Sequence, residues 1–114
     1  MATFDAPYYP EAFMNMENQR KTVYALVATG EYDFMSAGDR LEFGEHASIT
    51  VGMVRRYPNL EKLVEVEGWQ SLLPDAVSAE EAITMVRSEG DWDVEAEHEK
   101  GVMALRVREA RRKG

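Results

Sequence analysis

The sequence predicts an α+β fold, built on a mostly antiparallel sheet or small barrel with about three helices. Segments with strand character and segments with helix character are grouped along the chain instead of strictly alternating. The chain has 114 residues, of which 45% are hydrophobic, and this fits one domain with one core. We therefore expect a single domain over residues 1–114, in the order short strand, helix, three strands, two helices and final strand.

The first quarter of the chain predicts a strand, a helix and a second strand. Aromatic residues at mixed spacing over 1–9 indicate a short strand. Pro10 suits the first turn of a helix, which we expect to run to about Gln19. The β-branched and aromatic residues of Thr22–Val27 are typical of a strand, and a loop is expected over 28–37.

The next segment predicts a pair of strands joined by a turn. Gly38-Asp39 is a turn signal, and the alternating residues Arg40–Phe43 predict a short strand after it. Ser48–Tyr57 has the strongest strand pattern in the chain. Gly52 lies inside it and indicates a bulge or a close approach of another backbone.

The second half predicts two capped helices. Asn59 is expected to cap a helix that runs to about Glu67, and Leu72–Asp75 is expected to form a buried turn. Ser78 and Glu81 have the spacing of a capping box and should open a helix that stops near Gly90.

The C-terminal quarter is dominated by charge. Acids at every second position over 91–99 indicate a solvated edge or loop whose charge discourages aggregation. Gly101–Val107 predicts the last strand. The basic residues of 109–114 are expected to form a frayed tail.

The charge distribution favours a small ligand over a polyanion. The net charge is −8, and residues 58–100 carry 12 acids and 3 bases. Because nucleic-acid affinity comes largely from neutralising phosphates, an acidic domain is a poor general binder of duplexes. No apolar run approaches the length of a membrane span, so no membrane association is expected, and the cytoplasm is the expected location.

The composition also excludes several site chemistries. The chain has no cysteine, which removes disulfides, thiolate nucleophiles and cysteine-bound zinc. Its two histidines, His46 and His98, are far apart in sequence, and no Gly-rich phosphate loop is present. We therefore predict neither a metal nor a cofactor.

Lys21 is the residue best placed for chemistry, because it lies where the first helix hands over to a strand. If partly desolvated, its amine loses its proton near neutrality and acts as a base or nucleophile. A nearby carboxylate would instead hold it charged, as an acid or a stabiliser of an oxyanion. An isolated lysine on the surface has neither of these roles, so the position of Lys21 alone is weak evidence for a site.

Six short motifs strengthen the case for Lys21 as a site residue, because they follow one another in a specific order between residues 10 and 108. They are Gln19–Val23, Ala37–Phe43, Val54–Tyr57, Glu65–Gly68, Leu73–Asp75 and Gly101–Leu105. With this ordered set the chain resembles the ASCH domain family of the PUA-like superfamily. The resemblance implies an open, PUA-like β-barrel with a cleft beside the helix-to-strand junction.

The resemblance also implies a function. Members of the family act on RNA or nucleosides, and one small bacterial branch, which the chain resembles distantly, hydrolyses the amide of N4-acetylcytidine. That branch uses a lysine, a threonine three residues later and a glutamate. Carried over, the lysine is Lys21 and the glutamate is Glu67, with Glu65 or Asp75 as alternatives.

The chain departs from the family at the threonine position, which is Tyr24. A phenol with a pKa of about 10 cannot simply replace an aliphatic hydroxyl. Thr22, two residues earlier on the strand, should face the same side and would supply a hydroxyl instead if the strand shifts. An arginine that is usual in the family is Leu26 here. The predicted catalytic residues are Lys21, Glu67, Thr22 and Tyr24, and the predicted substrate-binding residues are Arg20, Glu65, Tyr57 and Asp75.

Three functions remain open on these residues. The first is an amidohydrolase acting on an acylated cytidine or cytosine, with a small nucleoside as its partner. The alternative is an ASCH module that binds single-stranded RNA, with or without weak ribonuclease activity. Its phosphate contacts would be Arg20, Lys21, Arg55, Arg56, Arg111, Arg112 and Lys113. The third is an interaction protein with an unused cleft.

Overall fold

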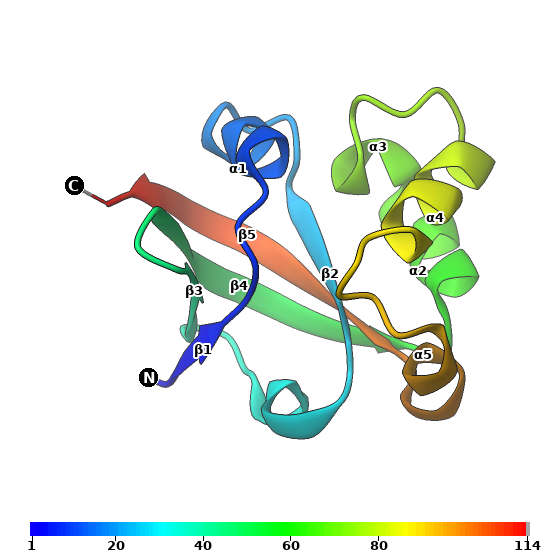
Figure 1. The fold of residues 1–114 in the computed structure, drawn as a ribbon, viewed down its shortest axis with the longest axis horizontal. Coiled ribbons are helices and arrows are strands. Elements are labelled where there is room, and N and C mark those ends of the chain that lie inside the picture. The colour runs from blue at the N-terminus through cyan, green and yellow to red at the C-terminus, as the bar shows by residue number, and fades with distance from the viewer. Residues whose placement is uncertain (114) are drawn as a thin grey trace.

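Five strands form one curled sheet, which is open on one side like half a barrel (Figure 1). The computed structural model describes residues 1–113. The strands are β1 (Thr3–Asp5), β2 (Val23–Val27), β3 (Arg40–Phe43), β4 (Ala47–Tyr57) and β5 (Val102–Arg112), in the sheet order β1-β3-β4-β5-β2. β1 pairs in parallel with β3, and the other pairs are antiparallel. The predicted α+β open barrel with a mostly antiparallel sheet is confirmed.

Five α-helices and one 3₁₀ helix accompany the sheet within residues 1–113, so the prediction of about three helices was too low. They are α1 (Pro10–Glu17), the 3₁₀ helix η1 (Gly30–Phe34), α2 (Leu60–Glu67), α3 (Trp69–Leu72), α4 (Ala79–Arg87) and α5 (Val94–Lys100). Helices α2–α5 gather beside the β2 edge of the sheet, while α1 lies apart from them (Figure 1). Helices α3 and α5 were not predicted: residues 69–71 of α3 had no predicted element, and α5 falls in the acidic run that was expected to be an edge or loop.

Strand β5 supplies side chains to two separate cores, because successive residues of a strand point to opposite faces. Met103 and Leu105 pack inside the half-barrel, where the other large residues include Phe13 and Phe43. Val102 and Ala104 pack on the opposite face against helices α2, α3 and α4. This double burial explains why the strand begins as a continuous apolar run.

The strand positions largely follow the sequence, and the bulge is confirmed. The register between β4 and β5 shifts at Val51–Val54, around Gly52. A Cβ on Gly52 would lie 3.3 Å from the carbonyl oxygen of Arg106, so the backbones approach closely there. The expected fraying of residues 109–114 is wrong as far as Arg112, because β5 pairs with β4 up to that residue. Gly114 lies outside the described residues.

Residues 94–99 of the acidic run 91–99 lie in helix α5 instead of a solvated edge or loop. The side chain of Asp93 caps the helix by accepting a hydrogen bond from the backbone N–H of Ala96 at 3.0 Å. The helix ends at Gly101, whose φ is +80°. A Cβ at this glycine would lie 2.6 Å from the carbonyl oxygen of Tyr57, so only glycine fits.

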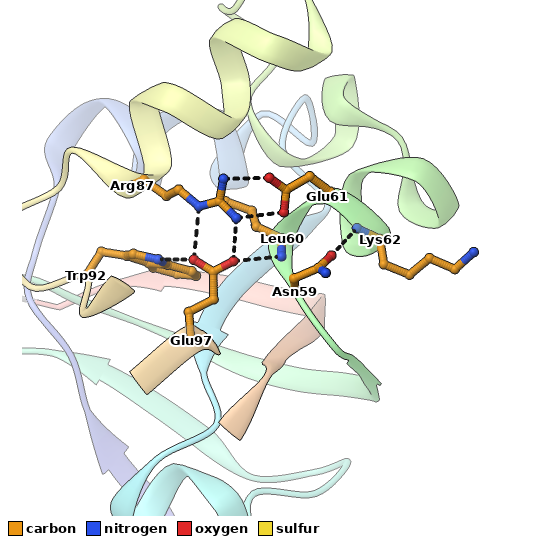
Figure 2. Close-up of polar contacts among 7 residues, drawn as sticks. All are labelled: Asn59, Leu60, Glu61, Lys62, Arg87, Trp92 and Glu97. Atoms are coloured by element: carbon orange, nitrogen blue, oxygen red, sulfur yellow. Dashed lines mark hydrogen bonds and ion pairs between the residues drawn. The ribbon is translucent and has the colours of Figure 1, made fainter. Parts of the chain in front are cut away.

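Glu97 is the reason that α5 docks on the domain (Figure 2). Its carboxylate is buried and accepts hydrogen bonds from the backbone N–H of Leu60 at 2.9 Å and from the Trp92 indole at 2.9 Å. Arg87 donates to both of its oxygens, at 3.0 and 2.7 Å, and also pairs with Glu61 at 2.7 Å. One carboxylate thus ties α5 to the first turn of α2 and to the end of α4.

Candidate functional site

A left-handed residue places Lys21 after the first helix. Helix α1 ends at Glu17, and Gln19 two residues later has a φ of +67°, the single positive value outside glycine in residues 1–113. The chain then turns back, and the backbone N–H of Lys21 donates to the carbonyl of Asn15 at 2.9 Å. An L-residue in this conformation costs about 1 kcal/mol, so the turn stores strain immediately before Lys21.

Replacing Gln19 by glycine should therefore raise the free energy of unfolding by about 0.5–1 kcal/mol, because glycine adopts positive φ without strain. Urea denaturation measures the change. Gln70→Gly, inside helix α3, is the matched control and should lower stability by about 1 kcal/mol. If both substitutions lower stability equally, the strain assigned to Gln19 is absent.

Lys21 is buried, with 5% of its surface exposed. Its amine donates a hydrogen bond to the backbone carbonyl of Leu72, and within residues 1–113 it donates to no carboxylate. Burial lowers the pKa of Lys21 to about 8, against the opposing effect of Glu89. The amine therefore does not point into bulk water, the arrangement that would have favoured an interaction protein with an unused cleft.

Within residues 1–113, Lys21 borders three cavities, and we call two adjoining ones the inner and the outer cavity. The inner cavity has a volume of about 100 Å³ and lies between β2 and the segment that joins α4 to α5. The outer cavity has a volume of about 310 Å³ and lies between α1 and the turn at Leu73–Asp75. Tyr9, Lys21 and Glu89 line both, so the two cavities form one cleft beside the helix-to-strand junction.

Glu89 is the carboxylate whose charge acts on Lys21, and no sequence motif pointed to it. It follows the end of α4 and is half-buried in the cleft. Burial and the neighbouring Asp91 raise the pKa of Glu89, while Lys21 lowers it. The helix end that was predicted near Gly90 could have pointed to Glu89. A residue at that position lies where the chain leaves α4 and crosses the cleft.

Glu67 lies away from this cleft. It accepts a hydrogen bond from the hydroxyl of Tyr57 and lies 3.6 Å from the guanidinium of Arg55. Both Arg55 and Glu67 line a separate, small cavity that Lys21 does not border. The structure therefore brings Glu67 together with Tyr57, but not with Lys21.

The two hydroxyl candidates line different cavities. Tyr24 is buried, lines the inner cavity, and has a pKa raised by that burial. Thr22 lines a third cavity of about 410 Å³, which also contains Arg106 and Arg108. Lys21 borders both cavities, but the expectation that Thr22 takes the place of Tyr24 on one side is not met.

Of the remaining predicted residues, Asp75 lies at the rim of the cleft with Arg20 beside it, whereas Glu65 lies elsewhere. Arg20 forms an ion pair of 3.0 Å with Asp75, which lines the outer cavity. The buried Asn15 donates to the same carboxylate at 2.9 Å. Glu65 is exposed and pairs with Lys62 at 3.4 Å, away from the cleft.

Two further classes of site were sought within residues 1–113. No three histidine, aspartate or glutamate side chains there are placed to hold a metal ion. No helix in that part of the chain combines the length and apolar character that crossing a bilayer requires.

Comparison with known proteins identifies relatives by fold. No protein-family model and no curated protein sequence matches the chain. The hypothetical protein PH0355 from Pyrococcus, known from a crystal structure, matches with a TM-score of 0.82 at 23% identity, over 94% of this chain and 97% of that one. Protein PF0455 from Pyrococcus furiosus, known from a solution NMR structure, matches with a TM-score of 0.73 at 24% identity, over 94% and 96% of the two chains. These likenesses show the fold alone.

Proposed function

We propose that the protein is an amidohydrolase that removes the acyl group from an acylated cytosine-type base or nucleoside. The observation that carries the proposal is the buried amine of Lys21 in the same cleft as the half-buried carboxylate of Glu89. Desolvated acid–base pairs of this kind are a mark of functional sites. The resemblance to the ASCH family, through Lys21 and the motifs around it, supports the choice of substrate.

The two groups divide the reaction between them. Glu89 takes a proton from a water molecule, and the oxygen of that water attacks the carbonyl carbon of the amide. At pH 7 most of Lys21 is charged, so its ammonium stabilises the negative oxygen that develops. The carbon–nitrogen bond then breaks, Glu89 returns the proton to the leaving nitrogen, and the products are a carboxylic acid and a free amine.

The cleft fits a small substrate. The outer cavity, about 310 Å³, falls at the lower end of the range for small-molecule sites, which is about 300–1,000 Å³. The base would lie in the outer cavity, with its acyl group directed towards Lys21 and the inner cavity. Tyr24 and Tyr9 line the inner cavity and would contact the acyl group.

The ion pairs of the basic residues favour a small substrate over RNA. All of the basic residues expected to contact phosphates, apart from Lys21, pair with carboxylates of the chain itself. The pairs are Arg20–Asp75, Arg55–Glu67, Arg56–Asp33, Arg111–Glu109, Arg112–Glu17 and Lys113–Glu42. A phosphate would have to displace these partners, so we rank RNA binding second.

The proposal is tested by incubating the pure protein with a panel of acylated cytosines and cytidines and following release of the free amine. We expect turnover by the wild-type protein, a loss of at least about 100-fold in kcat for Glu89→Gln, and activity that declines above pH 8 as Lys21 loses its proton. Glu67→Gln is the matched control and should retain activity. No turnover of any member of the panel would refute the proposal, and loss of activity in Glu67→Gln alone would return the catalytic role to Glu67.

A further inference from the structure

The inner cavity has aromatic walls. Its aromatic lining residues are Tyr9, Tyr24, Tyr32 and Trp92, which come from four different segments of the chain. The amine of Lys21 lies 5.4 Å from the centroid of the Tyr24 ring, so one of these rings already faces a cation. The negative face of an aromatic ring attracts cations at such distances.

Hydrogen bonds fix the other three rings. Tyr9 donates its hydroxyl proton to Asp91, Tyr32 donates to the carbonyl of Asp5, and the Trp92 indole donates to Glu97. Because these polar groups are satisfied within the chain, the rings offer a ligand mainly their apolar surfaces. Fixed walls of this kind also reduce the entropy lost on binding.

Carboxylates outnumber amines in the same cavity. Its charged lining residues within the described chain are Lys21, Glu89, Asp91 and Asp93. The side chain of Glu89 makes no hydrogen bond within residues 1–113, although it is half-buried. The carboxylate of Asp91 affects a neighbouring ring: hydrogen bonding to Asp91 and burial raise the pKa of Tyr9 to about 12.

We propose that the inner cavity binds a compact organic cation, such as a methylated ammonium group, between its aromatic walls and the carboxylates of Glu89 and Asp91. Aromatic rings combined with carboxylates suit a cation whose positive charge is spread over apolar methyl groups. The cavity volume of about 100 Å³ fits a group of that size and is too small for a nucleoside. The inference does not rest on the amide hydrolysis proposed above, since it concerns binding alone.

Two probes of the same shape test the proposal. Choline carries a trimethylammonium group, and 3,3-dimethyl-1-butanol replaces its nitrogen with carbon and has no charge. In a calorimetric or NMR titration without any acylated substrate, we expect choline to bind at least about tenfold more tightly than the neutral alcohol. Equal affinities, or no saturable binding of choline, would overturn the proposal.

Variants locate the site and separate it from hydrolysis. Asp91→Asn should weaken choline binding about tenfold, whereas Glu45→Gln removes one charge from an exposed turn and should leave it unchanged. Lys21→Met should bind choline more tightly, because a competing positive charge is removed, while losing hydrolysis. If Asp91→Asn and Glu45→Gln weaken binding equally, choline responds to net charge and the proposed site is wrong.

Discussion

Replacing Lys21 by methionine should stabilise the protein at pH 7 and abolish hydrolysis of the proposed substrates. A lysine pKa lowered from 10.5 to about 8 corresponds to about 3 kcal/mol of unfavourable charge burial at neutral pH. Methionine removes this cost but leaves the carbonyl of Leu72 without its hydrogen bond, which costs about 1–2 kcal/mol. The net gain in the free energy of unfolding should be about 1–2 kcal/mol.

The gain should also depend on pH. Between pH 8 and 10.5 the unfolded chain binds the lysine proton and the folded chain does not, so the free energy of unfolding of the wild-type protein rises with pH. Lys21→Met lacks this rise, and its advantage should therefore shrink as the pH approaches 10.5. Urea denaturation at pH 7 and pH 10 measures both values.

Lys62→Met supplies the control for this experiment. Lys62 is largely exposed and pairs with Glu65 at 3.4 Å, so its replacement should change stability by less than about 0.5 kcal/mol at either pH. If Lys21→Met is less stable than the wild-type protein at both pH values, the amine is not destabilised by burial. The inference that the protein loses stability by burying Lys21 in the site would then be wrong.

The elements that the sequence predicts well are those whose signals are local. The caps at Asn59 and Ser78 require one side chain and a backbone N–H three residues away, and both form, at 2.8 and 3.1 Å. Strand β3 follows from four alternating residues after a turn signal, and its predicted bounds are those observed. The bulge at Gly52 likewise follows from one residue and its strand.

The docking of helix α5 and the role of the site carboxylate could not be predicted, because each depends on a partner distant in sequence, although the cap of α5 at Asp93 is a local signal. Glu97 reads as one acid among five at alternating positions until Arg87 and Leu60 are placed beside it. In the same way Glu89 becomes a candidate site residue only because it lies near Lys21, which is 68 residues earlier in the chain. Sequence motifs led instead to Glu67, which the fold pairs with Tyr57.

The same network connects stability to the cleft. Arg87 and Trp92 flank the segment 88–91, which carries Glu89 and Asp91 along the cavity wall. Both flanking side chains bind the carboxylate of Glu97 (Figure 2). Glu97 therefore holds both ends of the segment that supplies the negative charge of the site.

Glu97→Ala should lower the free energy of unfolding by about 3–5 kcal/mol, because it leaves buried donors of Arg87, Trp92 and Leu60 without an acceptor. Urea denaturation at pH 7 measures the loss. Burial raises the pKa of Glu97, but the hydrogen bonds from Arg87 and Trp92 outweigh it, and the pKa is lowered overall. The carboxylate thus stabilises the fold above its ordinary pKa, and this contribution is lost as the pH falls through the lowered value.

Glu61→Ala is the matched control, since Glu61 binds the same guanidinium of Arg87 at 2.7 Å but lies largely exposed. Exposed ion pairs contribute little, so this variant should lose about 1 kcal/mol or less. Arg87 then keeps its bonds to Glu97, and the segment that carries Glu89 stays in place. Equal losses in the two variants would mean that the ion pairs of Arg87 act as a surface network, and that burial of Glu97 does not fix α5 or the wall of the cleft.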